Sequence, residues 1–319
     1  MQKSFDGCIS VAICTRNRSS SLNLTLESLS RMQSLEGASW ELLIIDNGST
    51  DSTDAVVANF VKRLPVRRIF EAKPGLSNAR NRAVDEACGR YLVWTDDDVT
   101  VEPGWLAAYA AAFSEYPDAA IFGGKILPIL LPPTPKWFKD ELPQLSSLLA
   151  YRDFGANPVE LDPKIGRVPF GANYAIRMKE QKAIRYDAAL GAGSKLGLLG
   201  EEGQVICAIL NAGAYGRWLP DSVVHHRIGP DRQTVSYVMK YYRSQGATAG
   251  HLDSLSEINL YFGLPRWLIK RLAARFLLYR FQRAVMPPRV WVKSLIDYAF
   301  SLGQAEYWRS IYQIRIENN

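Results

Sequence analysis

The chain has 319 residues, 47% hydrophobic and 22% charged, with a formal net charge of +6. This composition excludes a disordered or fibrous chain and predicts a globular protein with a sizeable core. The positive charge suits an anionic small molecule, an anionic membrane surface or a nucleic acid as partner.

Short apolar runs with high β propensity alternate with helical patterns over the first hundred residues. The first helical pattern has Leu22, Leu26 and Leu29 on one face and follows a serine cluster that can cap the helix. A second helix is capped within Thr50–Asp54, and a third covers about Gly75–Ala87. This alternation predicts an α/β fold with parallel strands and right-handed crossovers. The four predicted strands are Cys8–Cys14, Glu41–Asp46, Val66–Phe70 and Tyr91–Thr95.

Polar residues follow three of these strands directly. They are Thr15-Arg16, Asp46-Asn47 and Asp96-Asp97-Asp98. Ligands of open parallel sheets bind beyond the carboxyl ends of the strands. We therefore expect these three strand ends to line one crevice.

The later part of the chain is less regular. Pro103 can open a helix, and a strand is predicted around Ala120–Ile126. The proline-rich stretch Pro128–Pro143 predicts an extended loop or flap. A helix is expected from about Glu201 to Asn211, and the chain looks mostly helical after Arg232.

The acidic run Asp96-Asp97-Asp98 is a candidate metal site. Three adjacent carboxylates repel one another unless a cation or hydrogen-bond donors share the site. Mg²⁺ and Mn²⁺ prefer oxygen ligands of this kind. A solvated acidic turn is the alternative, and the position after a buried strand favours the metal site. Asp46, at another strand tip, can accept hydrogen bonds from a base.

Four motifs in order resemble the family 2 glycosyltransferases, which are inverting enzymes of the GT-A fold. The resemblance covers about residues 8 to 235. The implied fold is a mixed, mainly parallel sheet flanked by helices. The motifs are Ala-Ile-Cys-Thr-Arg-Asn-Arg (12–18), Ile-Ile-Asp-Asn-Gly-Ser-Thr-Asp (44–51), Gly-Leu-Ser-Asn-Ala-Arg-Asn-Arg-Ala (75–83) and Thr-Asp-Asp-Asp-Val (95–99).

The resemblance implies roles in holding a nucleoside-diphosphate sugar. Thr15 and Arg16 would lie near the nucleoside, and Asp46 would bind a base such as uracil or thymine. Arg80 would reach the diphosphate. In the acidic run, Asp96 would contact the ribose with Asp97 beside it, and Asp98 would bind Mn²⁺ or Mg²⁺ between the phosphates.

The resemblance also implies a general base and a second metal ligand. The family places the base in a Glu-Asp pair at a helix start, and the match here is Glu201-Glu202. We choose Glu202, with Glu201 as the alternative. The alternative to a catalytic role is that the two acids only stabilise the positively charged N-terminus of a helix. His226 fits the metal position better than His225.

The resemblance favours transfer of one sugar to a saccharide or lipid-linked acceptor in cell-surface polysaccharide or glycoconjugate synthesis. UDP- and dTDP-sugars both remain open as donors. Three alternatives are a sugar-nucleotide pyrophosphorylase, a processive synthase and a non-catalytic binding module. A pyrophosphorylase should carry a glycine-rich signature after the first strand, and residues 15–18 contain no glycine. A processive synthase usually carries spanning helices and a Gln-x-x-Arg-Trp motif. Here Arg217-Trp218 is present, but position 214 is Ala and no spanning helix is expected.

Three domain segments are expected: a nucleotide-binding half at about 8–126, an acceptor half at about 127–235, and a helical region at 236–319. In the helical region, residues 266–283 form an amphipathic basic helix with Leu268, Leu272, Phe276 and Leu277 on one side. Pro287-Pro288 ends it, and a second helix is predicted for Val290–Phe300. The basic helix either contacts an anionic membrane or packs on the protein. Nucleic-acid binding is disfavoured because no motif accompanies the charge.

A cytoplasmic location, on its own or at the inner face of the membrane, is expected from two features. The first residues lack the apolar core of a signal peptide. The four cysteines form no zinc-binding spacing and suit free thiols in a reducing compartment.

Overall fold

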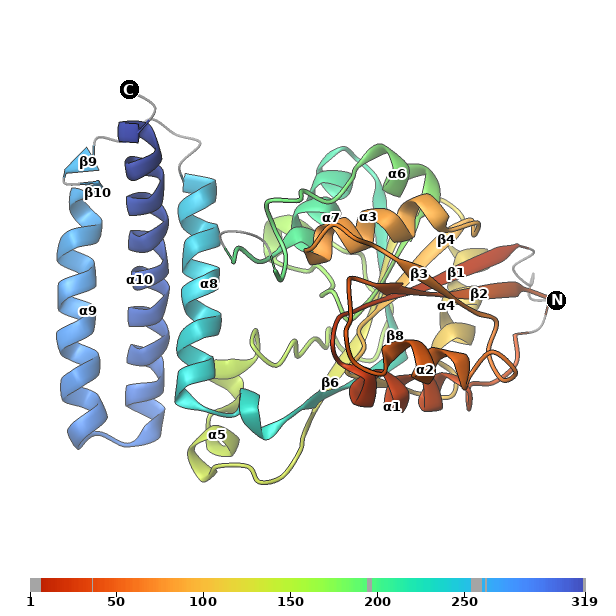
Figure 1. The fold of residues 1–319 in the computed structure, drawn as a ribbon, viewed down its shortest axis with the longest axis horizontal. Helices are drawn as coiled ribbons and strands as arrows, with labels where there is room; N and C mark the ends of the chain where they lie inside the picture. Colours follow the sequence, from red (N-terminus) through yellow and green to blue (C-terminus); the bar gives the residue numbers. More distant parts are fainter. Residues whose placement is uncertain (1–6, 36, 194–196, 254–259, 262, 318–319) are drawn as a thin grey trace. The chain divides into compact units, whose positions relative to one another are not determined.

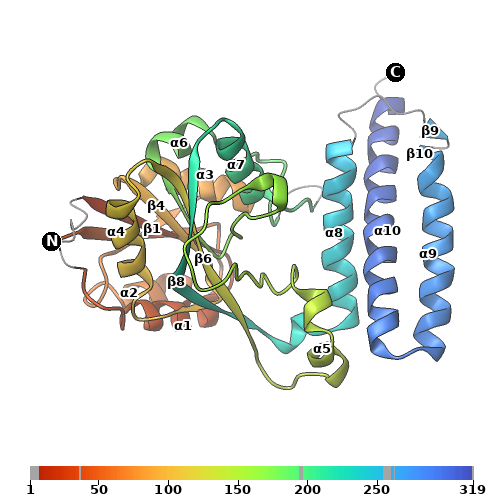
Figure 2. The ribbon, with the colours of Figure 1, turned by 180° about the vertical axis from the view of Figure 1, so that it is seen from behind.

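The computed structural model describes residues 7–35, 37–193, 197–253, 260–261 and 263–317 (Figures 1 and 2). Residues 1–6, on which the signal-peptide expectation rests, lie outside this range. The chain forms two compact units. Unit 1 comprises 1–129, 150–188 and 201–227, and unit 2 comprises 130–149, 189–200 and 228–319. The predicted functional boundary near residue 235 stays a prediction.

The four predicted parallel strands are confirmed, and they form one half of an eight-stranded sheet. The order β3-β2-β1-β4 places the first strand in the middle. Thr15 pairs with Asp46 at the carboxyl end of two neighbouring strands, so their polar tips share one sheet edge. The strands are β1 (Cys8–Thr15), β2 (Ser39–Asp46), β3 (Val66–Phe70) and β4 (Tyr91–Thr95).

The other half of the sheet is largely antiparallel. It continues from β4 in the order β7-β6-β8-β5. Strand β5 pairs with β8, and Val99 lies opposite His226. This pairing carries the end of a distant strand back to the acidic run. These strands are β5 (Val99–Val101), β6 (Ala119–Leu130), β7 (Asn173–Arg177) and β8 (Tyr215–Ile228).

Helices cover both faces of the sheet, as continuous apolar strands require. Alternate residues of β2 point to opposite cores: Leu42 and Ile44 join one cluster, and Leu43 and Ile45 the other. The first cluster includes residues of α1 (Ser19–Leu29), α2 (Thr53–Ala58) and α4 (Trp105–Glu115). The second includes residues of α3 (Leu76–Glu86), α6 (Met178–Ala183) and α7 (Glu201–Asn211). Figure 1 shows α3 and α7 on the side opposite α1 and α2.

The predicted serine cap of the first helix is wrong. No side chain at the N-cap of α1 makes a cap hydrogen bond. The backbone N–H of Ser19 instead donates to Asp51 Oδ2 at 2.9 Å. Asp51 Oδ1 also accepts from the backbone N–H of Thr53 at 3.1 Å, so one aspartate serves the starts of two helices.

Unit 2 is built around three long helices, and its predicted helical character is confirmed. Two glycines allow α8 and α10 to approach closely: a Cβ on Gly246 would lie 1.9 Å from the Phe300 carbonyl oxygen, and one on Gly303 would lie 1.8 Å from the Arg243 carbonyl oxygen. No described helix is long and apolar enough to cross a bilayer. The helices are α8 (Val235–Asp253), α9 (Arg266–Val285) and α10 (Pro288–Glu317), with a short hairpin of β9 (Leu260–Tyr261) and β10 (Leu264–Pro265).

Three sequence predictions change in or near unit 2. The expected loop at 128–143 is partly ordered, since β6 runs to Leu130 and the segment then forms α5 (Lys136–Asp140) and a 3-10 turn, η1 (Leu142–Leu145). The predicted helix at 290–300 extends to Glu317, and it packs on α8, α9 and β10. The predicted apolar stripe of α9 is split: Leu268 is buried, whereas Leu277 is 66% exposed.

Candidate active site

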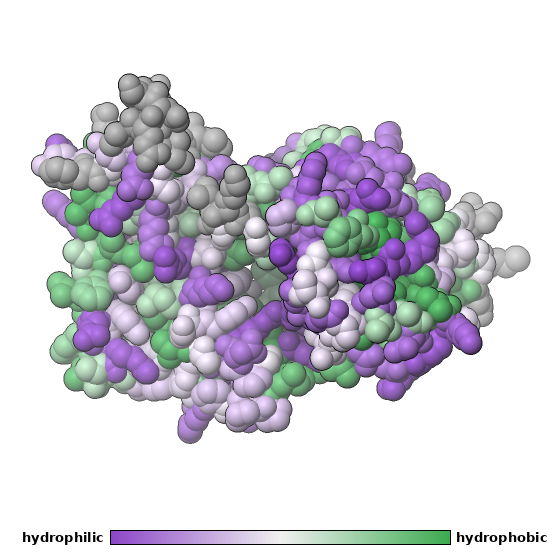
Figure 3. All heavy atoms as spheres, viewed as in Figure 1, coloured by the Kyte–Doolittle hydropathy of each residue, from purple (hydrophilic) through white to green (hydrophobic). Residues whose placement is uncertain are grey.

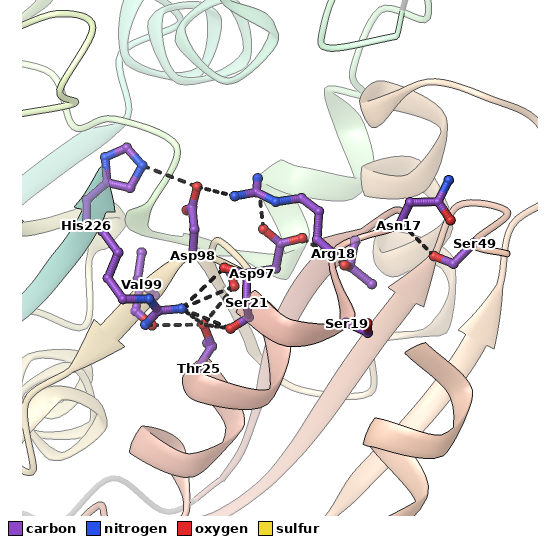
Figure 4. A network of polar contacts seen from close by, with 12 residues as sticks. Asn17, Arg18, Ser19, Ser21, Thr25, Ser49, Asp97, Asp98, Val99 and His226 are labelled. Atoms are coloured by element: carbon purple, nitrogen blue, oxygen red, sulfur yellow. Dashed lines mark hydrogen bonds and ion pairs between the residues drawn. The ribbon is translucent and has the colours of Figure 1, made fainter. Parts of the chain in front are cut away.

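The acidic run lies at the carboxyl edge of the sheet, between β4 and β5. Arg18, at the start of α1, holds two of its carboxylates (Figure 4). Its guanidinium nitrogens lie 3.1 Å from Asp97 Oδ1 and 2.8 Å from Asp98 Oδ2. Thr15 Oγ1 donates a 2.7 Å hydrogen bond to Asp97 Oδ2. The repulsion between these carboxylates is therefore offset by the positive charge of the Arg18 guanidinium and by the hydrogen bond from the Thr15 hydroxyl.

Burial dominates the protonation behaviour of this run. It raises the pKa of Asp97 to about 7, although Arg18 opposes the shift. Burial also raises the pKa of Asp96, with the charge of Asp98 adding to it and the charges of Arg80 and His226 opposing it. The charges of Arg80 and of His226 thus both act on the Asp96 carboxylate.

His226 lies beside Asp98, with 3.4 Å between its Nε2 and Asp98 Oδ2. His225 points elsewhere, to Glu102 Oε1 at 2.6 Å. The following residue, Arg227, fastens the acidic loop: its side chain donates to the Thr25 hydroxyl at 3.0 Å and to the backbone carbonyl of Val99. The sheet pairing therefore brings the predicted histidine to the predicted aspartate.

The donor chemistry of this pair fits a divalent cation. A carboxylate and an imidazole, both buried, face one point where the positive charge of Arg18 already resides. Within the described part of the chain, no three His, Cys, Asp or Glu side chains group as a complete metal site. A cation held by Asp98 and His226 would thus need further ligands such as phosphate oxygens or water, the usual mode of Mg²⁺ and Mn²⁺. Their role as metal ligands stays a prediction.

Asp46 is buried at the tip of β2, and its two oxygens are engaged within the protein. Oδ1 accepts from the backbone N–H of Ser49 at 2.7 Å. Oδ2 accepts from Arg68 Nε at 3.1 Å and from an Arg68 terminal nitrogen at 2.6 Å. Burial alone would raise the pKa of Asp46, but these donors hold it below its ordinary value. Its contact with a base stays a prediction and would require exchange of one of these partners.

Arg80 projects from α3 into a buried aromatic pocket. It donates to the Tyr174 hydroxyl at 2.6 Å and lies 3.6 Å from Glu201 Oε1. Its guanidinium carbon is 5.5 Å from the Trp94 ring centroid and 5.4 Å from that of Tyr186. The charge is thus fixed in place by rings and a carboxylate, and Arg80 is a buried residue, not a surface arginine of α3.

The two candidate bases lie in the first turn of α7, where the positive end of the helix favours carboxylates. Glu201 is buried against Arg80, and Glu202 is partly exposed. Glu202 and Arg80 meet at Gly171, where an added Cβ would lie 3.1 Å from Glu202 Oε1 and 3.0 Å from an Arg80 nitrogen. Only Glu202 therefore combines solvent access with this position.

Sequence reasoning missed four residues that hold the site: Arg18, Arg68, Tyr174 and Tyr186. Arg18 stands inside a quoted motif, and a cation at a strand end beside three acids was the available signal. The two tyrosines gave no local signal, because their hydroxyls reach Arg80 and each other, 2.7 Å apart, only through the fold. Arg16 is exposed and its predicted nucleoside contact stays a prediction.

We predict a pH-dependent stability difference for Glu201→Gln. Burial, then the charge of Glu202, raises the pKa of Glu201 from 4.5 to about 7. The folded chain therefore holds a proton that the unfolded chain has lost, and this stabilisation disappears as the pH rises through about 7. We expect the unfolding temperature of the variant to rise relative to that of the wild type as the pH is raised from about 5 to about 8. A constant difference between the two proteins across this range would contradict the burial argument.

A mixed sheet covered by helices, with an acidic loop after the fourth strand, is a GT-A fold. The mannosyltransferase PcManGT from Pyrobaculum calidifontis, in complex with GDP-Man and Mn²⁺, superposes with a TM-score of 0.57 at 16% identity, over 93% of this chain and 87% of that one. TarS from S. aureus gives 0.54 at 16% identity, over 98% and 92%.

The sequence comparison finds similarity to one glycosyltransferase family. Residues 10–153 match the model described as Glycosyl transferase family 2. The succinoglycan biosynthesis protein ExoM of Rhizobium meliloti (strain 1021) is 25% identical over 249 residues, 76% of this chain and 74% of that protein. A glucosyl-dolichyl phosphate glucuronosyltransferase of Haloferax volcanii is 29% identical over 136 residues, 42% of each chain. Residues 10–153, somewhat less than half of the chain, therefore resemble glycosyltransferase family 2, and the comparisons support glycosyltransferase activity.

Proposed function

We propose that this chain is an inverting, metal-dependent glycosyltransferase that moves one sugar from a UDP- or dTDP-sugar to a hydroxyl of a saccharide or lipid-linked acceptor. The convergence of Asp98 and His226 with Arg80 and Glu202 at one sheet edge is the main support. Asp96, which feels the charges of Arg80, His226 and Glu202, links the two groups.

In the proposed reaction an acceptor hydroxyl attacks the anomeric carbon of the donor sugar. Glu202 takes the hydroxyl proton as the new carbon–oxygen bond forms. The bond between the anomeric carbon and the diphosphate oxygen breaks, and the nucleoside diphosphate leaves with both bonding electrons. Arg80 compensates charge on the diphosphate. A divalent cation held by Asp98 and His226 would supply Lewis-acid stabilisation of the leaving group.

A cell-surface polysaccharide or glycoconjugate is the proposed product. The printed name of ExoM assigns that relative to succinoglycan biosynthesis, and the glucuronosyltransferase name refers to a dolichyl phosphate-linked sugar. These names motivate saccharide and lipid-linked acceptors for this chain. A cytoplasmic location belongs to the same proposal, supported by the four free cysteines of the described structure.

A donor panel tests the proposal. The purified protein is incubated with UDP-, dTDP- and GDP-sugars, with and without Mn²⁺, and released nucleoside diphosphate is measured. We expect release from a UDP- or dTDP-sugar, dependent on the metal, with an inverted anomer in the product when an acceptor is present. GDP-mannose is included because PcManGT was solved with it.

Two results of the panel would contradict the proposal. Metal-dependent binding of a donor without turnover of any donor would indicate the non-catalytic binding module. Release of nucleoside triphosphate and sugar 1-phosphate from a donor after inorganic pyrophosphate is added would indicate a sugar-nucleotide pyrophosphorylase.

A further inference from the structure

Helix α9 carries two apolar faces. The face toward α10 comprises Leu268, which is buried, and Leu272, Tyr279 and Gln282, which are partly buried. Arg275 joins this face through a 2.6 Å hydrogen bond to the Ser301 hydroxyl. The spacing of these residues follows one side of a helix, so this face is the one that holds α9 in unit 2.

The second apolar face is exposed. Leu277 is 66% exposed, Phe281 60% and Val285 61%. With Trp267 and Leu278 they occupy a sector roughly 100° wide on the side away from Leu268. Among the described residues, seven of the seventeen large exposed apolar side chains lie on this one helix, and Figure 3 shows apolar surface gathered over it. Such a concentration marks an interaction surface.

The charges of α9 have one sign. The helix contains six basic residues and no acidic one. By their helical positions, Arg266 and Arg280 border the exposed sector on one side and Arg271 borders it on the other. Lys270 lies within the sector, near the N-terminal end of the helix. The guanidinium carbon of Arg271 lies 4.5 Å from the centroid of the Trp267 ring. Long basic side chains beside an apolar strip can reach anionic groups while their stems stay in contact with it.

We propose that the exposed face of α9, centred on Leu277, Phe281 and Val285, lies in the interfacial region of an anionic lipid bilayer. The apolar sector would enter the acyl boundary while the bordering cations meet lipid phosphates. A second copy of this chain fits less well, because it would bring two sets of like charges together.

Vesicle sedimentation tests this proposal with the full-length protein. We expect binding to vesicles containing phosphatidylglycerol, weaker binding at high salt, and little binding to phosphatidylcholine alone. The double variant Leu277→Asp/Phe281→Asp should bind anionic vesicles at least about tenfold more weakly, because two apolar side chains that would be buried in the acyl boundary are replaced by anions. Val61→Asp and Ile165→Asp, at residues 58% and 63% exposed in unit 1, are the matched controls.

Two further measurements keep the result interpretable. Thermal unfolding and donor binding of the double variant should match wild type, which separates loss of the lipid surface from loss of fold or of the proposed function. Equal vesicle binding by wild type and the double variant would overturn the proposal. The proposal would also be overturned if the wild type bound no vesicles and instead formed a dimer, seen by light scattering without lipid, that the double variant did not form.

Discussion

Asp98→Ala is expected to abolish metal-dependent turnover. Asp98 is the buried carboxylate that faces both His226, at 3.4 Å, and Arg18, at 2.8 Å. Its removal takes away the anionic ligand of the proposed cation, and metal stabilisation of a leaving group is worth several kcal/mol. We expect a loss of at least about 10³-fold in kcat. Turnover of the preferred donor, with Mn²⁺ as the varied component, measures this.

The Asp98→Ala variant should still fold, because Arg18 keeps Asp97 as a partner at 3.1 Å. Electron paramagnetic resonance of Mn²⁺ gives a second readout, in which the variant should leave more of the ion free. Asp118→Ala, at an exposed position after α4, is the matched control and should behave as wild type. Unchanged manganese-stimulated turnover in Asp98→Ala would remove this residue from the metal site.

Glu202→Gln is expected to cut kcat by about 10² to 10⁴-fold, the usual contribution of a general base. Glutamine keeps the shape of the side chain beside Gly171 but cannot accept the proton of the acceptor hydroxyl. Donor binding should change little, because the proposed donor contacts are made by Arg80 and Asp98. Single-turnover rates and calorimetric donor affinity together test this split.

Glu201→Gln is the matched comparison for the base. Glu201 is buried and 3.6 Å from Arg80, so its replacement should act mainly on donor affinity and stability. If Glu201→Gln lost the chemical step while Glu202→Gln kept it, the two roles would be exchanged. Full activity in both variants would leave the reaction without a base from this helix.

The parallel half of the sheet could be predicted because its strands are short and three of them, β1, β2 and β4, are largely apolar. β1, β2 and β4 carry residues for both cores, and the pattern is local. The acidic run and the Glu pair were also visible, since each adjoins a predicted element. The antiparallel half was not, because the place of β8 depends on pairing with β5, over a hundred residues earlier.

Side-chain partners were the least predictable feature. Tyr174 and Tyr186 meet Arg80 from elements about a hundred residues away. Spacing also misled the interpretation of α9, because Leu268 and Leu277 both fit an apolar pattern but point to opposite sides. Periodicity shows that a face is apolar, and only the packing shows which face is covered.

Arg18 has a consequence for cation binding at the acidic run. Its guanidinium pairs with both Asp97 and Asp98 from within the same chain. The acidic run therefore has a cationic partner in the folded chain before any ligand arrives. A divalent cation bound at Asp98, as proposed, would have to displace this tethered guanidinium.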